Sequence, residues 1–227
     1  TFTMGSPTTE AGRSTTSETE HNVTLTKGFY LGKYEVTQAQ YEALMTGNTD
    51  SLSATPSQWP NNPNRPVEKV SWADAQIFLT RLNTQQSANI PAGWAYVLPT
   101  ESQWEYACRA GTTTAYSWGD AISASDANWN HGNGANQTED VGQYSANPWG
   151  FFDMHGNVWE WCQDWYGDYP GGSVTDPTGA ASGRGRVLRG GSFLSQTSDV
   201  RSAKRAYLQP VISAVTYGFR VLRSSIK

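Results

Sequence analysis

The sequence contains few cysteines, and no stretch of it is long and apolar enough to span a membrane. Cys108 and Cys162 lie far apart with no second pair around them, which argues against a disulfide-dense scaffold and against a zinc ribbon. We interpret both as small buried hydrophobic residues. No run approaches the roughly 18 to 20 apolar residues that cross a bilayer, so we expect no membrane insertion. The first residues do not resemble a signal peptide, and Thr1 opens in what reads as the middle of a strand, so we expect residues to precede it.

Charge is scarce as well. Only 16% of the residues are charged, the net charge is -4 and the isoelectric point is near 5.4. Lys and Arg are scattered along the chain without a basic run. A domain that binds nucleic acid normally carries a basic patch, so the composition argues against a nucleic-acid partner.

Aromatic and turn-forming residues are abundant. Aromatic residues make up 12% of the chain, which has 10 Trp and 22 Gly. A length of 227 residues suits one large domain or two small ones, and no linker separates the motifs described below. We therefore predict a single domain, residues 1–227, with an α+β fold whose core depends on Trp and Tyr.

Three helices are predicted from their starts. In each case a Ser or Thr is followed three residues later by an acid or an amide, which is the capping box that satisfies free amide donors at a helix start. After the third helix, Gly111 is placed where a left-handed C-terminal cap is expected. The three pairs are Thr37 with Gln40, Ser71 with Asp74, and Thr100 with Gln103.

Strand signals are short, and much of the chain carries none. We predict strands at residues 23–25, 29–34, 158–161, 187–189 and 219–222. Residues 111–157 are dense in Gly, Asn, Ser and Asp, with Trp118, Trp129 and Trp149 among them. This stretch is too aromatic for a disordered linker, so we predict ordered irregular structure held by aromatic anchors or by a bound metal.

The stretch 186–223 has two patterned ends and a middle without pattern. It reads RVLRGGSFLSQTSDVRSAKRAYLQPVISAVTYGFRVLR, and residues 206–217 within it carry no charge. Large apolar residues in that middle follow neither a strand nor a helix period. If exposed, they form a patch of the kind that marks a binding site, and the alternative is that half of them pack under the loop.

Seven motifs in order resemble one family. They read GFYLGKYEVTQAQY, PVEKVSWADA, LPTESQWEYACRAG, YSWGD, GFFDMHGNVWEWCQDWY, RVLRGGSF and GFRVLR, and they resemble the formylglycine-generating enzyme, or sulfatase-modifying factor, superfamily over essentially the whole chain. The resemblance implies a formylglycine-generating-enzyme-type variant of the C-type lectin fold, with low regular secondary structure, small antiparallel sheets and a few packed helices.

The same resemblance implies that the family's oxidase chemistry is absent. Members that oxidise a sulfatase cysteine carry two copper-binding cysteines just after the GGS motif, and thiolates suit Cu(I) because both are soft. The matching positions in this chain hold Ser195 and Val200. Neither can supply a thiolate, so we expect no copper.

A calcium site is implied by the resemblance too. In the family the ion is held around a loop whose matching residues here are Asp153, Gly156, Val158 and Glu160. Such a loop offers carboxylates and carbonyl oxygens, which calcium prefers. The alternative is that Glu160 points to solvent or caps a neighbouring amide.

The histidines and arginines have simpler interpretations. His21, His131 and His155 could suggest an iron site, but the helical domain that carries iron in one branch of the superfamily is missing, so we interpret them as loop or surface residues. Four arginines near the C-terminus could mark an anion site, but we favour salt bridges that tie loops together. These are Arg189, Arg201, Arg205 and Arg220.

A second resemblance concerns the variable proteins of diversity-generating retroelements, some of which share this fold. Their diversified region lies between a GGS-type and a GFRV-type motif, as residues 193–217 do here. In residues 206–217 only Gln209 lies outside the set of residues reached by randomising the first two bases of an Asn codon. The candidate ligand-binding residues are Phe193, Leu194, Ser195, Gln196, Tyr207, Leu208, Gln209, Val211, Ile212, Ser213, Val215 and Tyr217.

The sequence therefore favours a non-catalytic, calcium-stabilised, monomeric domain that binds a protein or another macromolecule through residues 193–217. The alternative is an oxidoreductase, either a formylglycine generator acting on a sulfatase or an enzymatic relative with a small substrate.

Overall fold

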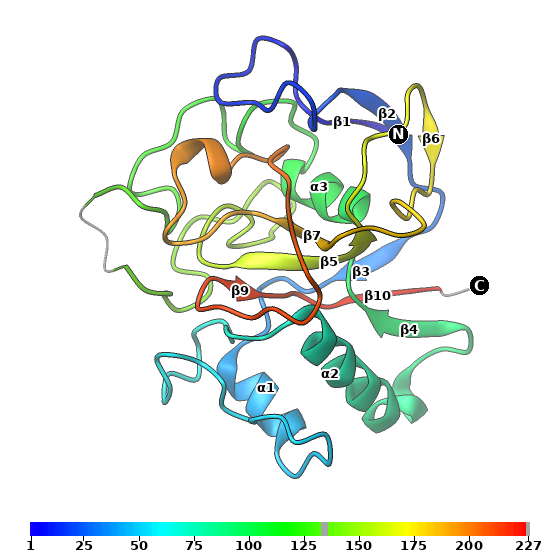
Figure 1. Ribbon diagram of the computed structural model, residues 1–227, viewed down its shortest axis with the longest axis vertical. Coiled ribbons are helices and arrows are strands. Elements are labelled where there is room, and N and C mark those ends of the chain that lie inside the picture. The colour runs from blue at the N-terminus through cyan, green and yellow to red at the C-terminus, as the bar shows by residue number, and fades with distance from the viewer. Residues whose placement is uncertain (133–135, 226–227) are drawn as a thin grey trace.

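The computed structural model describes residues 1–132 and 136–225 of the chain. In Figure 1 two of the three small sheets run across the middle of the molecule, with α3 above them and α1 and α2 below, and the third sheet lies near the top. Regular structure is sparse, and the fold is α+β, as predicted. The elements are β1 (Phe2–Met4), β2 (His21–Thr24), β3 (Phe29–Leu31), α1 (Gln38–Met45), α2 (Trp72–Gln85), the 3-10 turn η1 (Ser87–Asn89), β4 (Trp94–Val97), α3 (Glu101–Arg109), β5 (Trp159–Trp165), β6 (Val174–Thr175), β7 (Arg186–Arg189), the 3-10 turn η2 (Thr197–Asp199), β8 (Ala206–Leu208), β9 (Tyr217–Gly218) and β10 (Leu222–Ser225).

The three helices begin where their capping boxes predict. Thr37, Ser71 and Thr100 each accept a bond from the third helical amide, and the side chain at that third position accepts a bond from the cap amide in return. The end of α3 differs from the prediction by one residue, because Ala110 already adopts the left-handed conformation (φ 48°) that we assigned to Gly111. The longest helix, α2, has 14 residues, and no helix in the described part of the chain is long and apolar enough to cross a membrane.

Three small sheets join strands that are distant in sequence. Their orders are β1-β2-β6, β3-β10-β4 and β8-β7-β5-β9. The predicted strand at residues 219–222 is wrong for its first three residues, because there the chain passes from the sheet that contains β9 to the sheet that contains β10. On the way, the carbonyls of Phe219 and Val221 accept single bonds from the amides of Val36 (2.9 Å) and Gly32 (2.7 Å).

The main core lies between the sheets and the α1–α2 pair, and it is built from aromatic rings. Trp161 of β5 is fully buried, and its indole N–H donates to the carbonyl of Val70 at 2.9 Å. Phe78 of α2 stacks on Tyr41 of α1 and meets Phe219 edge-on, with ring centroids 5.4 and 5.2 Å apart. Large rings whose polar atoms are satisfied bury much area in a small domain, and this arrangement agrees with the high aromatic content of the sequence.

Residues 111–157 are irregular but anchored, as predicted, and their described part contains no helix or strand. The side-chain amide of Asn147 donates to the carbonyls of Ala107 (2.7 Å) and Cys108 (3.1 Å) at the end of α3. The exposed ring of Trp118 stacks on Tyr116, with centroids 5.4 Å apart. Side-chain bonds and rings therefore hold a stretch that has no ladder of its own.

Candidate functional site

Two buried arginines hold the first half of the segment 193–217, one just before it and one within it. Arg189, at the end of β7, is fully buried, forms an ion pair with Glu105 of α3, and donates to the carbonyl of Ser202 at 2.8 Å. Arg205, just before β8, forms two bonds with the carboxylate of Glu101 in α3, at 2.6 and 2.8 Å. Two charge-assisted contacts therefore attach the chain on either side of η2 to the same helix.

The other two predicted arginines also tie loops together. Arg201 binds both carboxylate oxygens of Glu18 near the N-terminus, at 2.9 and 3.0 Å. Arg220 binds both oxygens of Glu160 on β5, each at 2.6 Å. The prediction that these arginines serve loop structure rather than an anion site is confirmed by these pairs.

The GGS motif forms a turn that only glycine fits. Gly190 and Gly191 both have positive φ, 92° and 78°. A Cβ at Gly191 would lie 2.5 Å from the side chain of Val200, and one at Gly190 would lie 3.1 Å from the ring of Trp104. The turn therefore packs its backbone directly against neighbouring side chains, which fixes where the segment leaves β7.

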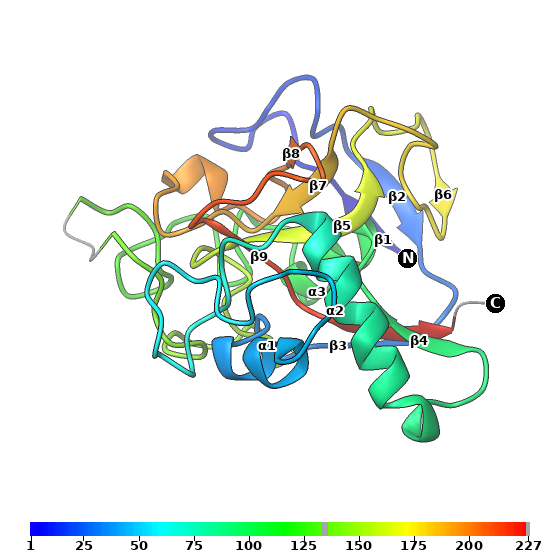
Figure 2. The same ribbon diagram turned by 60° about the horizontal axis from the view of Figure 1, so that its bottom comes forward.

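Hydrogen bonds from neighbouring elements fix the backbone of residues 206–217, which we call the displayed segment. Residues 206–208 form β8, which lies beside β7 (Figure 2) in antiparallel register. Beyond β8 the bonds come from the loop before α2, the first turn of α2 and the start of β5. They run from Ala73 N to Pro210 O (3.0 Å), from Lys69 N to Ala214 O (3.0 Å) and from Trp159 N to Thr216 O (2.8 Å).

Most predicted ligand-binding side chains in and before this segment point outward. Val211 is 71% exposed, Tyr207 47%, Leu194 46% and Ile212 42%, which makes four of the seven large exposed hydrophobic residues in the described structure. A backbone fixed by the rest of the fold therefore presents a row of uncharged side chains to solvent. The remaining exposed members of the predicted set are Gln196, Gln209 and Ser213.

Five predicted ligand-binding residues are not fully presented. Phe193 and Ser195 are buried, with 2% and 8% exposure, and the ring of Phe193 meets Trp59 at 5.5 Å. Leu208 and Tyr217 pack in part against the main core. These two and Val215 are half-buried, so the alternative that part of the stretch lies under the loop holds for these positions.

The positions that match the family's copper cysteines have structural roles. The hydroxyl of Ser195 accepts the amide N–H of Ser192 at 3.0 Å and closes the turn after β7. Val200 is fully buried in a small cluster with Tyr116. Neither side chain can bind a soft metal ion.

The two cysteines elsewhere cannot replace them. Both are buried and free. Burial raises the pKa of the Cys108 thiol to about 12 and that of Cys162 well above its usual value, so both are protonated at neutral pH. In residues 1–132 and 136–225, no group of three or more His, Cys, Asp or Glu side chains is placed to hold a metal ion.

His155 lies in a loop, as we interpreted it, but its side chain is buried rather than exposed at the surface. It is 3% exposed, its Nδ1 lies 2.7 Å from the carbonyl of Val200, and its Nε2 accepts the amide N–H of Ser117 at 3.2 Å. Burial lowers its pKa to about 4, so the ring is neutral. The neutral ring joins the irregular region 111–157 to the loop after β7. His21 is also buried, at 8% exposure.

The predicted calcium loop has a different arrangement from the one the resemblance implies. Glu160 is fully buried and its carboxylate binds Arg220 and the indole N–H of Trp104 (2.7 Å), so it does not point to solvent and its charge is already offset. Asp153, with φ 57°, accepts the amide N–H of Gly142 at 2.7 Å. Glu160 therefore does not fit a role as calcium ligand.

Two further carboxylates lie close to this ion pair. Glu35 is buried and accepts bonds from the side chain of Asn157 (2.7 Å) and the amide of Val158 (3.2 Å). Burial, followed by the charges of Asp153 and Glu160, raises the pKa of Glu35 well above its usual value. The carboxylates of Glu35, Asp153 and Glu160 thus lie near the guanidinium of Arg220. No motif in the sequence indicated that Glu35 belongs to this group.

Comparison with known proteins gives a consistent result. The family described as "Sulfatase-modifying factor enzyme 1-like domain" matches residues 1–225. Over 166 residues the chain is 38% identical to the serine/threonine-protein kinase pkn1 of Chlamydia caviae, covering 71% of this chain and 24% of that protein. Over 177 residues it is 37% identical to the formylglycine-generating enzyme of Streptomyces coelicolor, covering 70% of this chain and 52% of that enzyme. The chain thus spans about a quarter and about half of these relatives.

Solved structures match over nearly the whole chain. The Treponema denticola variable protein 1 has a TM-score of 0.78 and 27% identity, covering 98% of this chain and 94% of that one. PvdO from Pseudomonas aeruginosa has a TM-score of 0.84 and 27% identity, covering 98% of this chain and 90% of that one.

Proposed function

The chain belongs to the sulfatase-modifying factor family, and from this premise we propose that it is a non-catalytic member that binds a protein ligand through the exposed side chains of residues 193–217. One observation carries the proposal: the displayed segment is fixed at its backbone by the surrounding fold, while Val211 and Ile212 project large apolar groups into water. Exposed apolar side chains on a rigid support are what a protein interface needs, because little conformational entropy is lost on binding.

The proposed absence of formylglycine-generating chemistry rests on the missing thiols. Formylglycine formation in the family depends on two cysteines that bind copper, and this chain has Ser195 and Val200 at the matching positions. Its own two cysteines are buried and protonated. The competing function, an oxidoreductase acting on a sulfatase, lacks its metal ligands.

We further propose that residues 206–217 are a diversified region. The similarity to a protein named variable protein 1 supports this, as does the composition of the segment, in which only Gln209 lies outside the set reached from randomised Asn codons. Diversification also requires that the fold tolerate substitutions in residues 206–217. Side chains that make few contacts with the rest of the fold satisfy this requirement. Sequencing around the gene tests the proposal directly: a reverse transcriptase and a near-identical repeat are expected, and their absence would overturn diversification.

Binding is tested with a library, because the ligand is unidentified. A phage-displayed library of small protein domains is selected on the immobilised protein, and the binders are assayed against two variants. Binding should fall for the double variant Val211→Ser, Ile212→Ser and persist for Tyr30→Ser, which removes a ring that is 63% exposed on β3. Binders that ignore the double variant would refute the proposed face.

Catalysis is tested separately. A peptide that carries Cys-X-Pro-X-Arg, incubated with the protein, copper and a reductant, should keep its cysteine unchanged in mass. Formation of the aldehyde would show that the non-catalytic assignment is wrong.

We also propose that a calcium ion binds in the loop that contains Asp153. We place the ion at Asp153 and the carbonyls of Gly156 and Val158, without Glu160. What supports it is the excess of negative charge, because Glu35 and Asp153 lie beside an ion pair that already neutralises Arg220. An oxygen-preferring divalent cation would offset that excess.

A further inference from the structure

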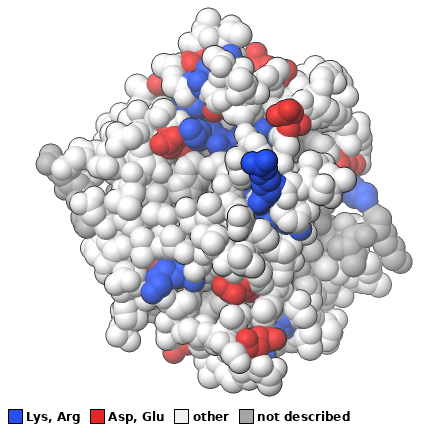
Figure 3. All heavy atoms as spheres, viewed as in Figure 1, with Lys and Arg blue, Asp and Glu red and all other residues white. Residues whose placement is uncertain are grey.

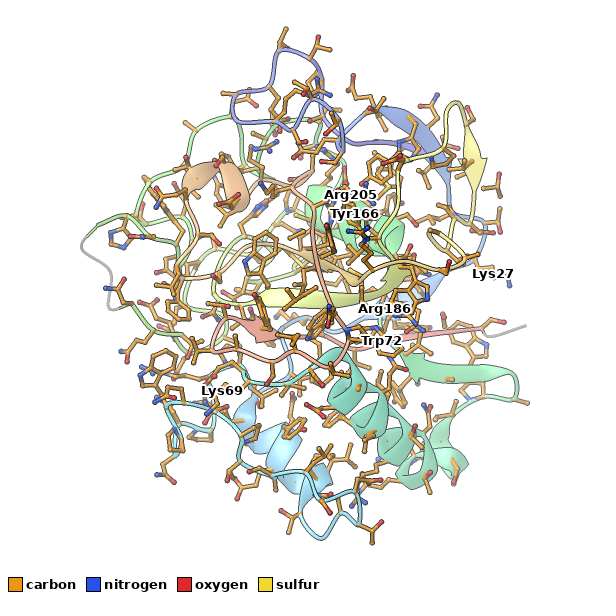
Figure 4. All side chains as sticks on the ribbon, viewed as in Figure 1. Lys27, Lys69, Trp72, Tyr166, Arg186 and Arg205 are labelled. Atoms are coloured by element: carbon orange, nitrogen blue, oxygen red, sulfur yellow. The ribbon has the colours of Figure 1, made fainter. Side chains whose placement is uncertain are left out.

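Arg186, the first residue of β7, lies between two tryptophan rings. The centre of its guanidinium is 4.0 Å from the ring centroid of Trp72 on α2 and 3.8 Å from that of Trp165 on β5. Figure 4 shows Arg186 next to Trp72 where the chain crosses in front of α2. Contact with two indole faces holds the guanidinium plane in one orientation. Because Nε is buried and Nη1 donates to Gln163, a ligand would approach the terminal Nη end of the group.

Arg186, which is half-buried, differs from the buried arginines in having no acidic partner. In the described residues no carboxylate lies within ion-pair distance of it, whereas Arg189, Arg205 and Arg220 all have one. Its guanidinium donates a hydrogen bond to the carbonyl of Gln163 at 2.6 Å, and its buried Nε has no partner in the described structure. The positive charge is therefore left without a counterion.

Asp164 is the acid whose charge acts on Arg186, but it does not neutralise the charge of this arginine at neutral pH. Burial, then the charge of Glu101, raises the pKa of Asp164 to about 8, so this carboxyl is mostly protonated at pH 7. One oxygen of Asp164 accepts the amide N–H of Glu101 at the start of α3 (2.9 Å), which gives the residue a structural role of its own. The uncompensated charge of Arg186 is thus a stable feature of the fold.

This charge lies at the edge of the displayed segment. Arg186 pairs in register with Leu208 of β8, and the exposed Tyr207 is the next residue. The displayed segment carries no charge. The exposed Lys69 donates its backbone amide to this segment, and the exposed Arg184 precedes Gly185, which packs against Leu208. Figure 3 shows that charged side chains are sparse over the middle of this side. A chain with net charge -4 therefore has the exposed cations Arg184 and Lys69 beside an uncharged segment.

We propose that Arg186 is a carboxylate-binding site that anchors an acidic side chain of the protein ligand bound on the displayed segment. This inference rests on the proposed function, which gives the position of the ligand, and it adds the chemical class that the ligand must present. A planar guanidinium binds a carboxylate through two parallel N–H···O bonds, and the two indoles exclude water from both faces of the plane. Arginine and tryptophan are also the residues most enriched at the centres of interfaces. Because Arg186 precedes the displayed segment, the anchor stays constant while neighbouring side chains vary.

The test uses acetylated tetraglutamate amide as the probe and tetraglutamine as its neutral match. In NMR spectra of the whole chain, tetraglutamate should shift the indole N–H signals of Trp72 and Trp165 and the Nε–H signal of Arg186 in a saturable way. Tetraglutamine should not shift them. Affinity for tetraglutamate should fall about tenfold or more in Arg186→Gln. It should remain unchanged in Arg223→Gln, an arginine that contacts the ring of Tyr30 on a different sheet.

Two outcomes would overturn the inference: signals that do not move with tetraglutamate, or equal shifts with tetraglutamine. If Arg186→Gln does not fold, Arg186→Lys keeps the charge without the planar fork and should weaken binding by a smaller factor. The library selection separates this inference from the proposed function. Binders that depend on Val211 and Ile212 but not on Arg186 would support the proposed binding face and refute the carboxylate site. Binders that depend on neither Val211 nor Ile212 would refute the binding face, whatever the result with tetraglutamate.

Discussion

Substitution should destabilise the protein strongly at Gly191 and hardly at all at Val211, although both residues lie in the same stretch of the chain. In Gly191→Ala the new Cβ would lie 2.5 Å from the side chain of Val200 and 2.9 Å from the carbonyl of Asp199, at φ 78°. The left-handed conformation costs a non-glycine residue about 1 to 2 kcal/mol. Relief of the clash costs about 1 to 3 kcal/mol more. We therefore expect a loss of about 2 to 5 kcal/mol.

Val211→Ser should be nearly neutral. Its side chain is 71% exposed, and surface substitutions of this kind usually change stability by less than about 0.5 kcal/mol. Urea unfolding of both variants measures the two free energies, with the slope checked for a constant value. Gly28→Ala is the matched control, since that glycine has no positive φ and a Cβ there meets nothing within 4 Å. A loss above about 1 kcal/mol for Val211→Ser would mean that the segment is packed rather than displayed.

Three other outcomes are expected. Burial raises the pKa of Glu68 to about 7, so the folded state holds this proton more tightly than the unfolded state. This carboxyl should therefore lower stability by about 1 to 2 kcal/mol, after solvent screening, as pH rises from 4.5 to 7, and urea unfolding of Glu68→Gln should lose that part of the pH dependence. Chelation with EDTA should lower the melting temperature, Asp153→Asn should abolish that shift, and Glu160→Gln should retain it; a shift that survives in Asp153→Asn would contradict the calcium placement. Cys108 and Cys162 should not react with a thiol-specific disulfide reagent in the native protein, and both should react in urea, so a reactive native thiol would count against the buried assignment.

Local signals in the sequence predicted the helices well. Each capping box is complete within four residues, so Thr37, Ser71 and Thr100 mark helix starts whatever the rest of the fold does. Strands were harder, since β1, β4, β6 and β8 have two to four residues each and depend on partners far away in sequence. Their short lengths leave no period to detect.

The position of the exposed segment in the chain was predictable, but the contacts of its side chains were not. The boundaries of the exposed segment follow from the flanking motifs, but the burial of Phe193 and Ser195 depends on Trp59 and on the turn after β7. The same limit applies to Arg186, because its two rings come from α2 and β5. Contacts between side chains that are distant in the chain leave no mark in a single sequence.

The position of β10 links folding to completion of the displayed segment during synthesis. This strand follows residues 206–217 in the chain, yet it is the central strand of its sheet, with β3 on one side and β4 on the other. A polypeptide that terminates within the displayed segment leaves β3 and β4 without the strand that joins them, and it also lacks Arg220, so Glu160 would be buried without its cation. A chain that terminates in this stretch should therefore fail to reach this fold, so the proposed binding face should form only in copies translated through the whole stretch.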